Sequence, residues 1–369
     1  MRSDTCKKKI LYYSHIDWAW IKQRPQFLAE ELAKFYSVTV HYKVQYHKET
    51  LDSAPRVRNG IQLHPFLLLP AMKNRSRILF LMNSILRKQK LSSLLRKLKP
   101  EYLWLTYPMQ ILDVPDWYKG TVIYDCMDDH VNLDCPRIWA DKIGTAEKAL
   151  VQRSSVVFVS SRFLLDTLKT KYCEHEDKLV IVRNACSEDL CNNRLPCSYH
   201  VGSKIVAGYI GTISSWLDFE SILESLHQFQ TLEYELLGPI ACENVPKHPR
   251  IHYRGVISHQ DLASHAKTMD LLVMPFLDYP FIRSVDPVKL YEYVSFGRNI
   301  LCSDYPEAHY FDGFVSFYKG SKDYCRKLQD LISMNERVYS DRAAQEFLSK
   351  NTWRVRAEQI HRVLEENAR

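Results

Sequence analysis

Residues 10–44 read ILYYSHIDWAWIKQRPQFLAEELAKFYSVTVHYKV, which predicts a strand, a helix and a second strand in succession. The two runs rich in aromatic and β-branched residues are typical of buried strands. Between them, Phe27, Leu28, Leu32 and Phe35 recur at the spacing of one helical face. This order predicts two parallel strands joined by a helix that covers the sheet.

Strands and helices continue to alternate along the chain, with one interruption. Residues 186–203, CSEDLCNNRLPCSYHVGS, are polar and rich in turn residues, which is typical of a linker. Hydrophobic residues make up 46% of the 369 residues and charged residues 25%, which excludes a disordered or fibrous protein. We therefore predict an α/β fold of two Rossmann-like, doubly wound domains, residues 1–185 and 204–350, followed by a helix within residues 351–369.

Polar side chains cluster where strands are predicted to end. Ligands of doubly wound sheets bind at the carboxyl ends of strands, so we expect a site in a cleft between the two domains. One strand end holds Gly208 and Gly211, followed by Thr212, Ser214 and Ser215. Small residues before a helix let backbone N–H groups approach an anion, which predicts phosphate binding at Gly211 and Thr212. A tight turn without a ligand explains the same pattern equally well.

Residues 286–297, DPVKLYEYVSFG, predict a second part of this site. Asp286 suits a helix N-cap and Pro287 suits the first helical turn, which places Lys289 and Glu292 on one face of the helix. Lys289 could hold a diphosphate while Glu292 accepts hydrogen bonds from ribose hydroxyls. The alternative is a surface ion pair of little energetic value.

Acidic residues crowd the end of the strand that closes with Asp125. Asp128, Asp129 and His130 follow it, and like charges at close range raise the pKa of a carboxyl group. Such a group could take the proton of a sugar hydroxyl. Asp128 and Asp129 are therefore candidate catalytic residues, with Asp128 as the first choice for a general base, and His130 is a candidate ligand of acceptor or phosphate. The acids could instead cap a helix or pair with basic side chains.

Three further candidates follow the first strand. His15 and Asp17 come directly after it, and Arg24 lies in the next helix. We take His15 as a candidate catalytic residue, and Asp17 and Arg24 as candidate ligands of the acceptor or of the donor phosphates. Trp18 and Trp20 indicate with equal weight that this loop is simply packed.

Basic charge is concentrated in one segment. Residues 53–100 contain eleven Lys or Arg and no Asp or Glu, whereas the whole chain has a formal charge of +7. Apolar residues recur there at helical spacing, which predicts one or two basic amphipathic helices. Core-packed helices with a solvated basic face explain this pattern, and so does a surface, residues 56–99, that binds anionic lipid headgroups. Nucleic acid is not expected as a partner, because aromatic residues are scarce and no nucleic-acid motif accompanies the segment.

The sequence predicts a reduced, cytoplasmic protein. No apolar run approaches the roughly 18 residues that span a bilayer, and the N-terminus does not read as a signal peptide. None of the ten cysteines forms a C-x-x-C pair, so we expect free thiols. Cys186, Cys191, Cys197 and His200 cluster, but their spacing fits no common zinc site.

Several segments of both halves resemble GT-B glycosyltransferases of the family 4 type. The most specific ones are YIGTISSWLDFESI, YELLGP, IHYRGVISHQDLASHAKTMDLLVMPF and DPVKLYEYVSFGRNILCSD, in this order within residues 209–304. In the first half, SHIDWAWIKQRPQFLAEEL and VIYDCMDDH resemble bacterial enzymes that assemble teichuronic acid and other polysaccharides. The resemblance implies that the N-terminal domain binds the acceptor, that the C-terminal domain binds a nucleotide sugar, and that the last helix crosses back onto the first domain.

The resemblance also assigns roles to residues. Glu292 matches the glutamate that binds the ribose, Lys289 matches a lysine that contacts the diphosphate, and Val256 lies in the loop that flanks the base. An earlier glutamate of many family members is replaced by Ser284, and no Arg or Lys follows the strand end at Gly211.

These departures leave Arg283 and Lys289 as the cations available to the diphosphate, helped by backbone N–H groups. Relatives often have a histidine where this chain has Met127, so the resemblance leaves the role of Asp128 open, together with retention or inversion of the anomeric centre. The chain contains no D-x-D motif, and the resemblance therefore implies a transferase that needs neither a metal nor a cofactor.

Residues and resemblance together predict a hexosyltransferase that moves a sugar from a UDP-linked donor onto a growing cell-surface glycan. The basic segment suggests a lipid-linked acceptor and a peripheral position on the inner face of the plasma membrane. A nucleotide-sugar epimerase, a phosphorylase of the same fold and a non-catalytic scaffold subunit are the alternatives.

Overall fold

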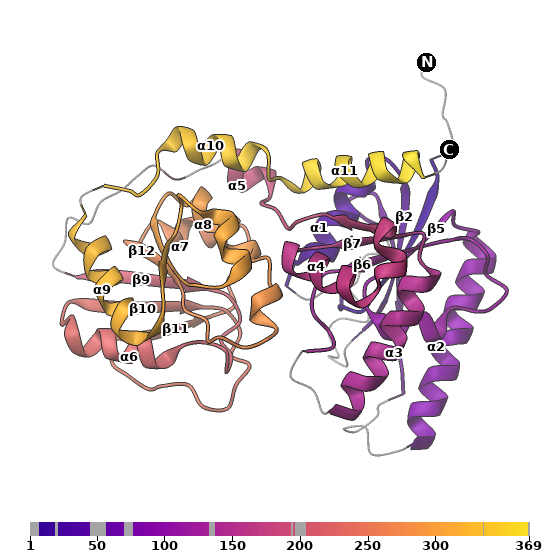
Figure 1. Ribbon diagram of the computed structural model, residues 1–369, viewed down its shortest axis with the longest axis horizontal. Helices are drawn as coiled ribbons and strands as arrows, with labels where there is room; N and C mark the ends of the chain where they lie inside the picture. Colours follow the sequence, from indigo (N-terminus) through magenta and orange to yellow (C-terminus); the bar gives the residue numbers. More distant parts are fainter. Residues whose placement is uncertain are drawn as a thin grey trace. The chain divides into compact units, whose positions relative to one another are not determined.

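The computed structural model describes residues 7–18, 21–44, 57–69, 77–132, 137–192, 195, 204–334 and 336–367. The chain forms two compact units, each with its own sheet (Figure 1). Each unit also has its own hydrophobic core. Unit 1 consists of Met1–Arg183 and Arg356–Arg369, and unit 2 consists of Asn184–Val355. The chain therefore returns to unit 1 at its end.

Unit 1 has an eight-stranded sheet in the order β3-β4-β2-β1-β5-β6-β7-β8. Neighbouring strands are parallel except β3 and β4, which form a short antiparallel edge. The chain builds one side of the sheet from β1 and then the other side from β5, so the strand order reverses between β1 and β5. The strands are Lys9–Ser14 (β1), Ser37–Lys43 (β2), Val57–Arg58 (β3), Ile61–Phe66 (β4), Tyr102–Leu105 (β5), Thr121–Cys126 (β6), Val156–Val159 (β7) and Leu179–Ile181 (β8).

Side chains alternate between the two faces of this sheet and form a core on each of them. Leu11 and Leu103 belong to a cluster that also contains residues of α2, α3 and α4. On the opposite face, Tyr12 stacks on Trp104 and Trp104 stacks on Phe158, with ring centroids 5.3 and 5.4 Å apart. The helices of unit 1 are Arg24–Leu32 (α1), Arg77–Leu98 (α2), Arg137–Arg153 (α3), Arg162–Lys171 (α4) and Trp353–Glu366 (α11).

The terminal helix α11 packs on unit 1. Phe35 stacks on His361 with ring centroids 4.6 Å apart, and the Tyr36 hydroxyl lies 2.8 Å from the Nδ1 atom of His361. Gln359 donates a hydrogen bond to the carbonyl of Ile181 at 2.8 Å. The prediction that the last helix crosses back onto the N-terminal domain is confirmed.

Unit 2 has a six-stranded, parallel sheet in the order β11-β10-β9-β12-β13-β14. Counted along the chain, this is the strand order of dinucleotide-binding folds, and it reverses between β9 and β12. The predicted α/β fold of two Rossmann-like, doubly wound domains is therefore confirmed. The strands are Ile205–Ile210 (β9), Leu232–Leu237 (β10), Ile251–Gly255 (β11), Leu271–Met274 (β12), Asn299–Ser303 (β13) and Ser316–Tyr318 (β14). The helices are Glu188–Asn192 (α5), Phe219–Gln228 (α6), Leu262–Ala266 (α7), Val288–Ser295 (α8), Gly320–Ser333 (α9) and Asp341–Ser349 (α10).

The described part of the predicted linker, residues 186–203, belongs to unit 2. It contains the short helix α5. Cys186 is completely buried and forms an isolated parallel bridge with Thr352. Apart from Leu195, the second half of the predicted linker lies outside the described residues.

The two central strands of unit 2 separate toward their carboxyl ends. β9 and β12 share only two residue pairs, the last of them Gly208 with Leu272. Beyond this pair, the backbone N–H of Ile210 donates a hydrogen bond to the Tyr293 hydroxyl at 2.8 Å. Tyr293 is a fully buried residue of α8, so this contact holds α8 against the separated strand ends.

Gly238 lets the end of β10 approach the loop that follows β9. Its φ is +147°, and a Cβ atom there would clash with the carbonyl oxygen of Gly211. We predict that Gly238→Ala lowers the free energy of unfolding by about 3 kcal/mol or more, because backbone atoms must move. Gly313→Ala is the matched control: φ is +85°, but nothing lies within 4 Å of the added Cβ. Its expected cost is about 1 kcal/mol. Equal losses for the two variants in urea denaturation would contradict the prediction.

Candidate functional site

Helix α8 carries the candidate site of unit 2. Pro287 is its N-cap residue, so the prediction of Asp286 as the cap is wrong. The Asp286 carboxylate instead accepts hydrogen bonds from the backbone N–H of Asn184 at 2.6 Å and from the Tyr291 hydroxyl at 3.2 Å. The Asp286 carboxylate thus holds the chain at the beginning of unit 2. It does not cap α8, which begins after Pro287.

Glu292 lies at the centre of this site. Its side chain is 3% exposed, and its Oε2 atom accepts a hydrogen bond from the Lys289 ammonium at 2.8 Å. The Nε2 atom of His259 lies 3.4 Å from Oε1. Burial raises the pKa of Glu292, but Lys289 and His259 outweigh this effect and hold the pKa below its usual range. Glu292 is therefore an ionised carboxylate with a nitrogen atom beside each oxygen.

The structure places Lys289 and Glu292 on one helical face, in agreement with the spacing in the sequence. The Lys289 side chain is 31% exposed, whereas Glu292 is buried. The ammonium group is thus the more exposed partner of the pair.

The loop after β9 differs from the prediction. Helix α6 begins at Phe219 and not directly after Gly211. Asp218 caps it by accepting a hydrogen bond from the Ser221 backbone N–H at 3.0 Å, and the Tyr318 hydroxyl donates to the same carboxylate at 3.3 Å. The expectation of a helix N-terminus open to phosphate at this point is wrong, because a buried carboxylate already occupies it.

Gly211 and Thr212 lie where the strand order of unit 2 reverses. The Gly211 N–H donates to the carbonyl of Leu237 at 2.8 Å. The backbone N–H groups of Thr212, Ser214 and Ser215 make no hydrogen bond to any residue that the structure describes. Such groups need water or a ligand as a partner. Phosphate binding by this loop stays a prediction that now depends on loop N–H groups and not on a helix end.

The other two predicted donor-binding residues lie in loops. The Arg283 guanidinium donates to the exposed Asp278 carboxylate at 2.9 and 2.8 Å, so it is already paired with an acid. Val256 is 58% exposed in the loop after β11, three residues before His259. Lys289 is therefore the predicted cation that the structure places beside Glu292.

In unit 1, His15 and His130 gather where the strand order reverses. The Nδ1 atom of His15 lies 2.8 Å from the Thr106 hydroxyl, at the end of β5. The Tyr107 ring contacts both imidazoles, with centroid distances of 5.5 and 5.0 Å. The Nε2 atom of His130 is buried and has no hydrogen-bond partner among the described residues. Burial lowers the pKa of His15 to about 3 and also lowers the pKa of His130, so both rings are neutral at pH 7.

The two candidate catalytic acids have different surroundings. Asp129 accepts hydrogen bonds from the backbone N–H and the side-chain amide of Asn132, at 3.2 and 2.7 Å, and so closes a turn. Burial raises the pKa of Asp128, and the opposing effects of His130 and Arg24 are smaller. Asp128 is therefore a stronger base than an ordinary surface aspartate, whereas Asp129 has a local structural partner.

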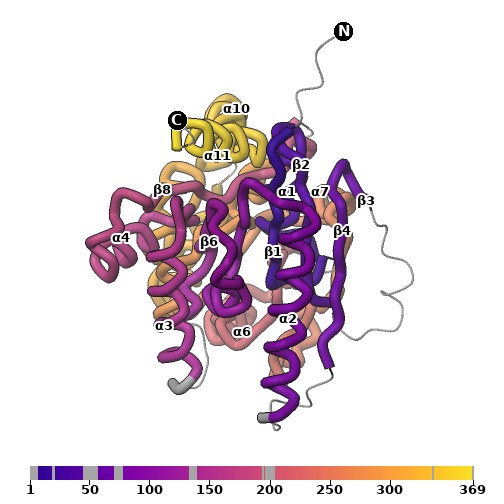
Figure 2. The backbone as a smooth tube through the Cα atoms, turned by 90° about the vertical axis from the view of Figure 1, so that its right-hand side faces the viewer, coloured from indigo at the N-terminus to yellow at the C-terminus, as the bar shows by residue number. Residues whose placement is uncertain are grey.

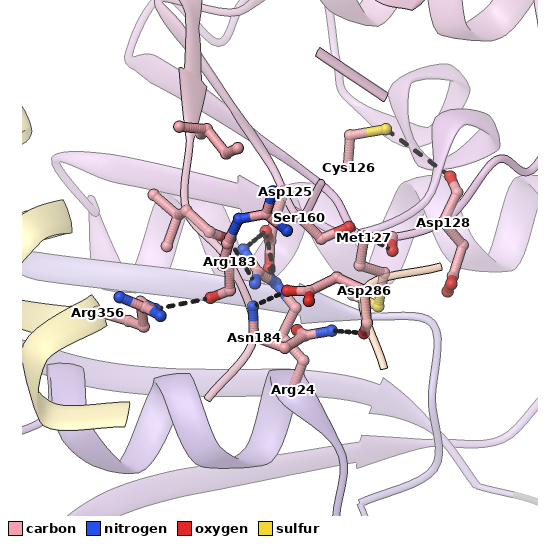
Figure 3. Close-up of polar contacts among 12 residues, drawn as sticks. Arg24, Asp125, Cys126, Met127, Asp128, Ser160, Arg183, Asn184, Asp286 and Arg356 are labelled. Atoms are coloured by element: carbon pink, nitrogen blue, oxygen red, sulfur yellow. Dashed lines mark hydrogen bonds and ion pairs between the residues drawn. The ribbon is translucent and has the colours of Figure 1, made fainter. Parts of the chain in front are cut away.

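Arg24 forms a buried ion pair with Asp125 (Figure 3). The Nη2 atom lies 2.8 Å from Oδ1, and the two side chains are 3% and 0% exposed. The Nη1 atom donates a hydrogen bond to the carbonyl of Val182 at 2.8 Å. The enclosed guanidinium joins three segments of unit 1, which gives Arg24 a structural role, and its contact with acceptor or phosphate stays a prediction.

The loop after β1 is partly packed, which agrees with the interpretation of Trp18 as a packing residue. Trp18 is 4% exposed, and its ring centroid lies 6.3 Å from that of Tyr42. Burial raises the pKa of Tyr42, and the charge of Asp17 adds to this effect. Asp17 is therefore close to a buried ring, and its contact with a ligand stays a prediction. Trp20 lies outside the described residues.

Neither a cluster of metal ligands nor a helix able to span a membrane occurs among the described residues. No group of three or more His, Cys, Asp or Glu side chains in this part of the chain could hold a metal ion. Cys197 and His200, two members of the cysteine cluster, lie outside it. None of the helices described is both long enough and apolar enough to cross a bilayer.

Sequence reasoning missed three residues that shape these sites: His259, Tyr293 and Tyr107. His259 lies four residues after the end of β11. Only this position in the loop after a strand could have indicated that it belongs to the site. Tyr293 is next to Glu292, but its buried side chain reads as an ordinary core residue. Tyr107 follows β5, and its position near His15 was available from the predicted parallel sheet.

We predict that Arg24→Met lowers the free energy of unfolding by about 3 to 5 kcal/mol, because it leaves the Asp125 charge buried without its partner. Lys34→Met is the matched control. It removes an exposed pair with Glu31, and should cost less than about 1 kcal/mol. Urea denaturation measures both. A stably folded Arg24→Met protein with lost nucleotide binding would instead support a phosphate-binding role.

The comparisons with known proteins agree with the motifs. No family model matches the chain. TuaH of Bacillus subtilis, whose name assigns it to glycosyl transfer in teichuronic acid biosynthesis, is 25% identical over 251 residues, which cover 59% of this chain. The match spans only 61% of the length of TuaH.

Solved structures match over nearly the whole chain. The sucrose-phosphate synthase of Thermosynechococcus elongatus has a TM-score of 0.71 at 12% identity, covering 98% of this chain and 99% of that one. HepE of Anabaena, in complex with UDP and glucose, has a TM-score of 0.69 at 14% identity, with coverages of 97% and 99%. These likenesses show the fold. The chain has the GT-B fold, and the resemblance of its sequence to glycosyltransferases of this group is confirmed.

Proposed function

We propose that this chain is a glycosyltransferase that moves a sugar from a nucleotide diphosphate sugar to a growing glycan. One observation carries the proposal: the ionised, buried Glu292 lies between Lys289 and His259 on a helix held against the point of strand reversal in a GT-B fold. Ligands of doubly wound sheets bind at such points. A fixed carboxylate suits hydroxyl groups, and a more exposed cation suits phosphate.

The donor would be held from two sides. Glu292 would accept hydrogen bonds from the ribose hydroxyls, and Lys289 would turn to the diphosphate. The N–H groups of Thr212, Ser214 and Ser215 would supply further donors to the phosphate oxygens. Lys289 and these N–H groups would neutralise the departing diphosphate, which is the basis for proposing a metal-independent reaction without a cofactor.

A UDP-linked donor is part of the proposal. The support comes from HepE, a protein of the same fold that was solved with UDP and glucose. The sugar itself is a hexose in that structure.

Asp128 is the proposed base for an inverting transfer. The acceptor hydroxyl oxygen would form a bond to the anomeric carbon while the bond from that carbon to the phosphate oxygen breaks. The electron pair of that bond leaves with UDP, and the hydroxyl proton passes to Asp128. Neutral His15 and His130 are available nearby to hydrogen-bond the acceptor or the donor phosphates.

A lipid-linked acceptor is proposed from the basic segment, residues 56–99. Anionic headgroups attract such a segment, and the enzyme would then meet its acceptor on the cytoplasmic face of the membrane. A nucleotide-sugar epimerase would instead release a rearranged sugar without any acceptor. A phosphorylase would need inorganic phosphate, and a scaffold subunit would bind nucleotide without turnover.

The donor site is tested with UDP and 2′-deoxy-UDP in calorimetric titrations. We predict that wild-type protein binds UDP about 10- to 100-fold more tightly than 2′-deoxy-UDP, because a hydrogen bond to a charged group is lost. Glu292→Gln should bind UDP more weakly and should no longer distinguish the two ligands. Lys289→Met should weaken the binding of UDP much more than the binding of uridine, which has no phosphate.

Lys267→Met is the control in the same titrations, because it removes an exposed lysine of unit 2, and it should bind like wild type. Arg283→Met tests the other predicted cation. It should also bind like wild type, because Arg283 is paired with Asp278, and weaker UDP binding would return Arg283 to the diphosphate. Unchanged discrimination in Glu292→Gln would assign the ribose to another residue and remove the main support for the proposal.

The catalytic base is tested by release of UDP from UDP-glucose, with a bacterial membrane lipid extract as the source of acceptor. Asp128→Asn should slow release by about 100- to 10,000-fold and leave UDP binding unchanged. A base acts when deprotonated, so the wild-type rate rises with pH. The raised pKa of Asp128 shifts this rise to higher pH than for an ordinary aspartate. Asp129→Asn is the control, and a similar loss in both variants would contradict the assignment.

A further inference from the structure

Helix α2 has an exposed apolar face in its first half. Ile78, Leu81, Met82 and Ile85 follow one another at helical spacing, and they are 72%, 61%, 45% and 46% exposed. We call these four residues the apolar stripe. Large aliphatic side chains gathered on one exposed face mark an interaction surface.

The stripe is not the face that α2 packs on unit 1. The core side is formed by Asn83, Leu91, Leu94 and Leu95, which are at most 8% exposed. Asn83, Leu91 and Leu94 lie on the other side of the helix from the stripe, as the helical period requires, and Leu95 lies between the two sides. Figure 2 shows α2 on the surface of unit 1. The first half of the helix is therefore apolar on a second face that the sheet does not cover.

Phe80 lies on another side of α2 than the stripe, two residues after Ile78, and contacts an aromatic side chain of α3. Phe80 is 42% exposed, and its ring centroid lies 6.0 Å from that of Trp139. The ammonium group of Lys142 lies 4.8 Å from the Trp139 centroid. An aromatic ring beside a cation is the arrangement that favours the boundary between headgroups and acyl chains.

Basic side chains follow the stripe along α2, with Arg96 on the same side of the helix and Lys88, Lys90 and Lys97 on its flanks. Lys88, Lys90, Arg96 and Lys97 are exposed, and residues 53–100 contain no acidic residue. Arg87 is different, because it forms an ion pair with the buried Asp113 at 2.9 Å. The exposed surface thus combines an apolar part with positive charge along one helix.

We infer that α2 lies on an anionic bilayer, with the apolar stripe inserted at the acyl-chain boundary and the basic residues at the headgroups. Charge complementarity selects this occupant, because nucleic acid offers the same negative charge without an apolar layer. The inference deepens the proposed function by naming the surface on which a lipid-linked acceptor would be met. It goes beyond attraction of the basic segment to lipid, since it requires insertion of four named side chains.

The experiment compares variants in sedimentation with vesicles. The vesicles contain phosphatidylcholine alone or phosphatidylcholine with phosphatidylglycerol. Ile78→Ser/Leu81→Ser/Ile85→Ser should bind the anionic vesicles at least about tenfold more weakly than wild type, because apolar burial is lost. Lys88→Gln/Lys90→Gln/Lys97→Gln should bind about 100-fold more weakly at low salt. Wild type should keep part of its binding at high salt, and the stripe variant should keep none.

Ile240→Ser/Met334→Ser/Val338→Ser is the matched control, since it removes three exposed apolar side chains of unit 2. It should bind vesicles like wild type. All variants are compared by circular dichroism to show that they fold. The vesicle assay contains neither donor nor acceptor, so its result does not depend on sugar transfer. A protein that binds vesicles as expected but shows no transferase activity would contradict the proposed function and not this inference.

Three outcomes would overturn the inference. The first is equal vesicle binding by wild type and the stripe variant. This would mean that the protein adsorbs to the headgroups by charge alone and that the apolar stripe does not insert. The second is a wild-type dimer in analytical ultracentrifugation that the stripe variant loses, which would make the stripe an interface between copies. The third is binding of single-stranded RNA but not of anionic vesicles, which would assign the basic residues to nucleic acid.

Discussion

Strands β9 and β12 stop pairing after two residue pairs, and the candidate donor site depends on what fills this opening. A buried backbone N–H without a partner is costly, and the Tyr293 hydroxyl supplies the partner of Ile210. Because Tyr293 is fixed there, the neighbouring Glu292 is fixed as well and cannot reach open solvent. Its charge must then be balanced locally, which Lys289 and His259 do. A helix positioned by packing thus presents an ionised carboxylate where the strand order reverses.

Unit 1 gives two nearby carboxylates opposite environments. Asp125 ends inside the sheet, where the Arg24 guanidinium pairs with it and keeps a charged group tolerable in the core. Asp128 lies just beyond the strand, where burial raises its pKa more than His130 and Arg24 lower it. On the proposed function, two acids whose environments differ in this way would divide structural from chemical work. The arrangement also encloses the Arg24 guanidinium in the same core.

The sequence predicted what depends on neighbours along the chain and failed where distant segments meet. Buried strands and the Lys289 and Glu292 pair follow from periods of two and from a spacing of three residues, so they were accessible. Strand β4 was missed, and it contains Pro65; β3 pairs only with Ile61 and Gln62, so β4 is open on that side at Pro65, where a proline is tolerated. His259 and Arg24 depend on partners 33 and 101 residues away along the chain, which spacing does not reveal. Helix α9 was missed although its buried residues recur at helical spacing.

Helix α2 shows a second limit of predictions from helical spacing. Helical spacing indicates that an apolar face exists, but it does not say what covers that face. Leu91 and Leu94 are covered by the sheet, whereas Ile78 and Leu81 carry the same chemical signal and remain exposed. An exposed aliphatic face keeps an unfavourable contact with water unless a partner outside the chain removes it. The basic residues along the same helix narrow the choice of that partner to an anionic surface with an apolar layer beneath its charges. On the proposed function, this surface would also hold the acceptor, so one contact would serve both docking and substrate encounter.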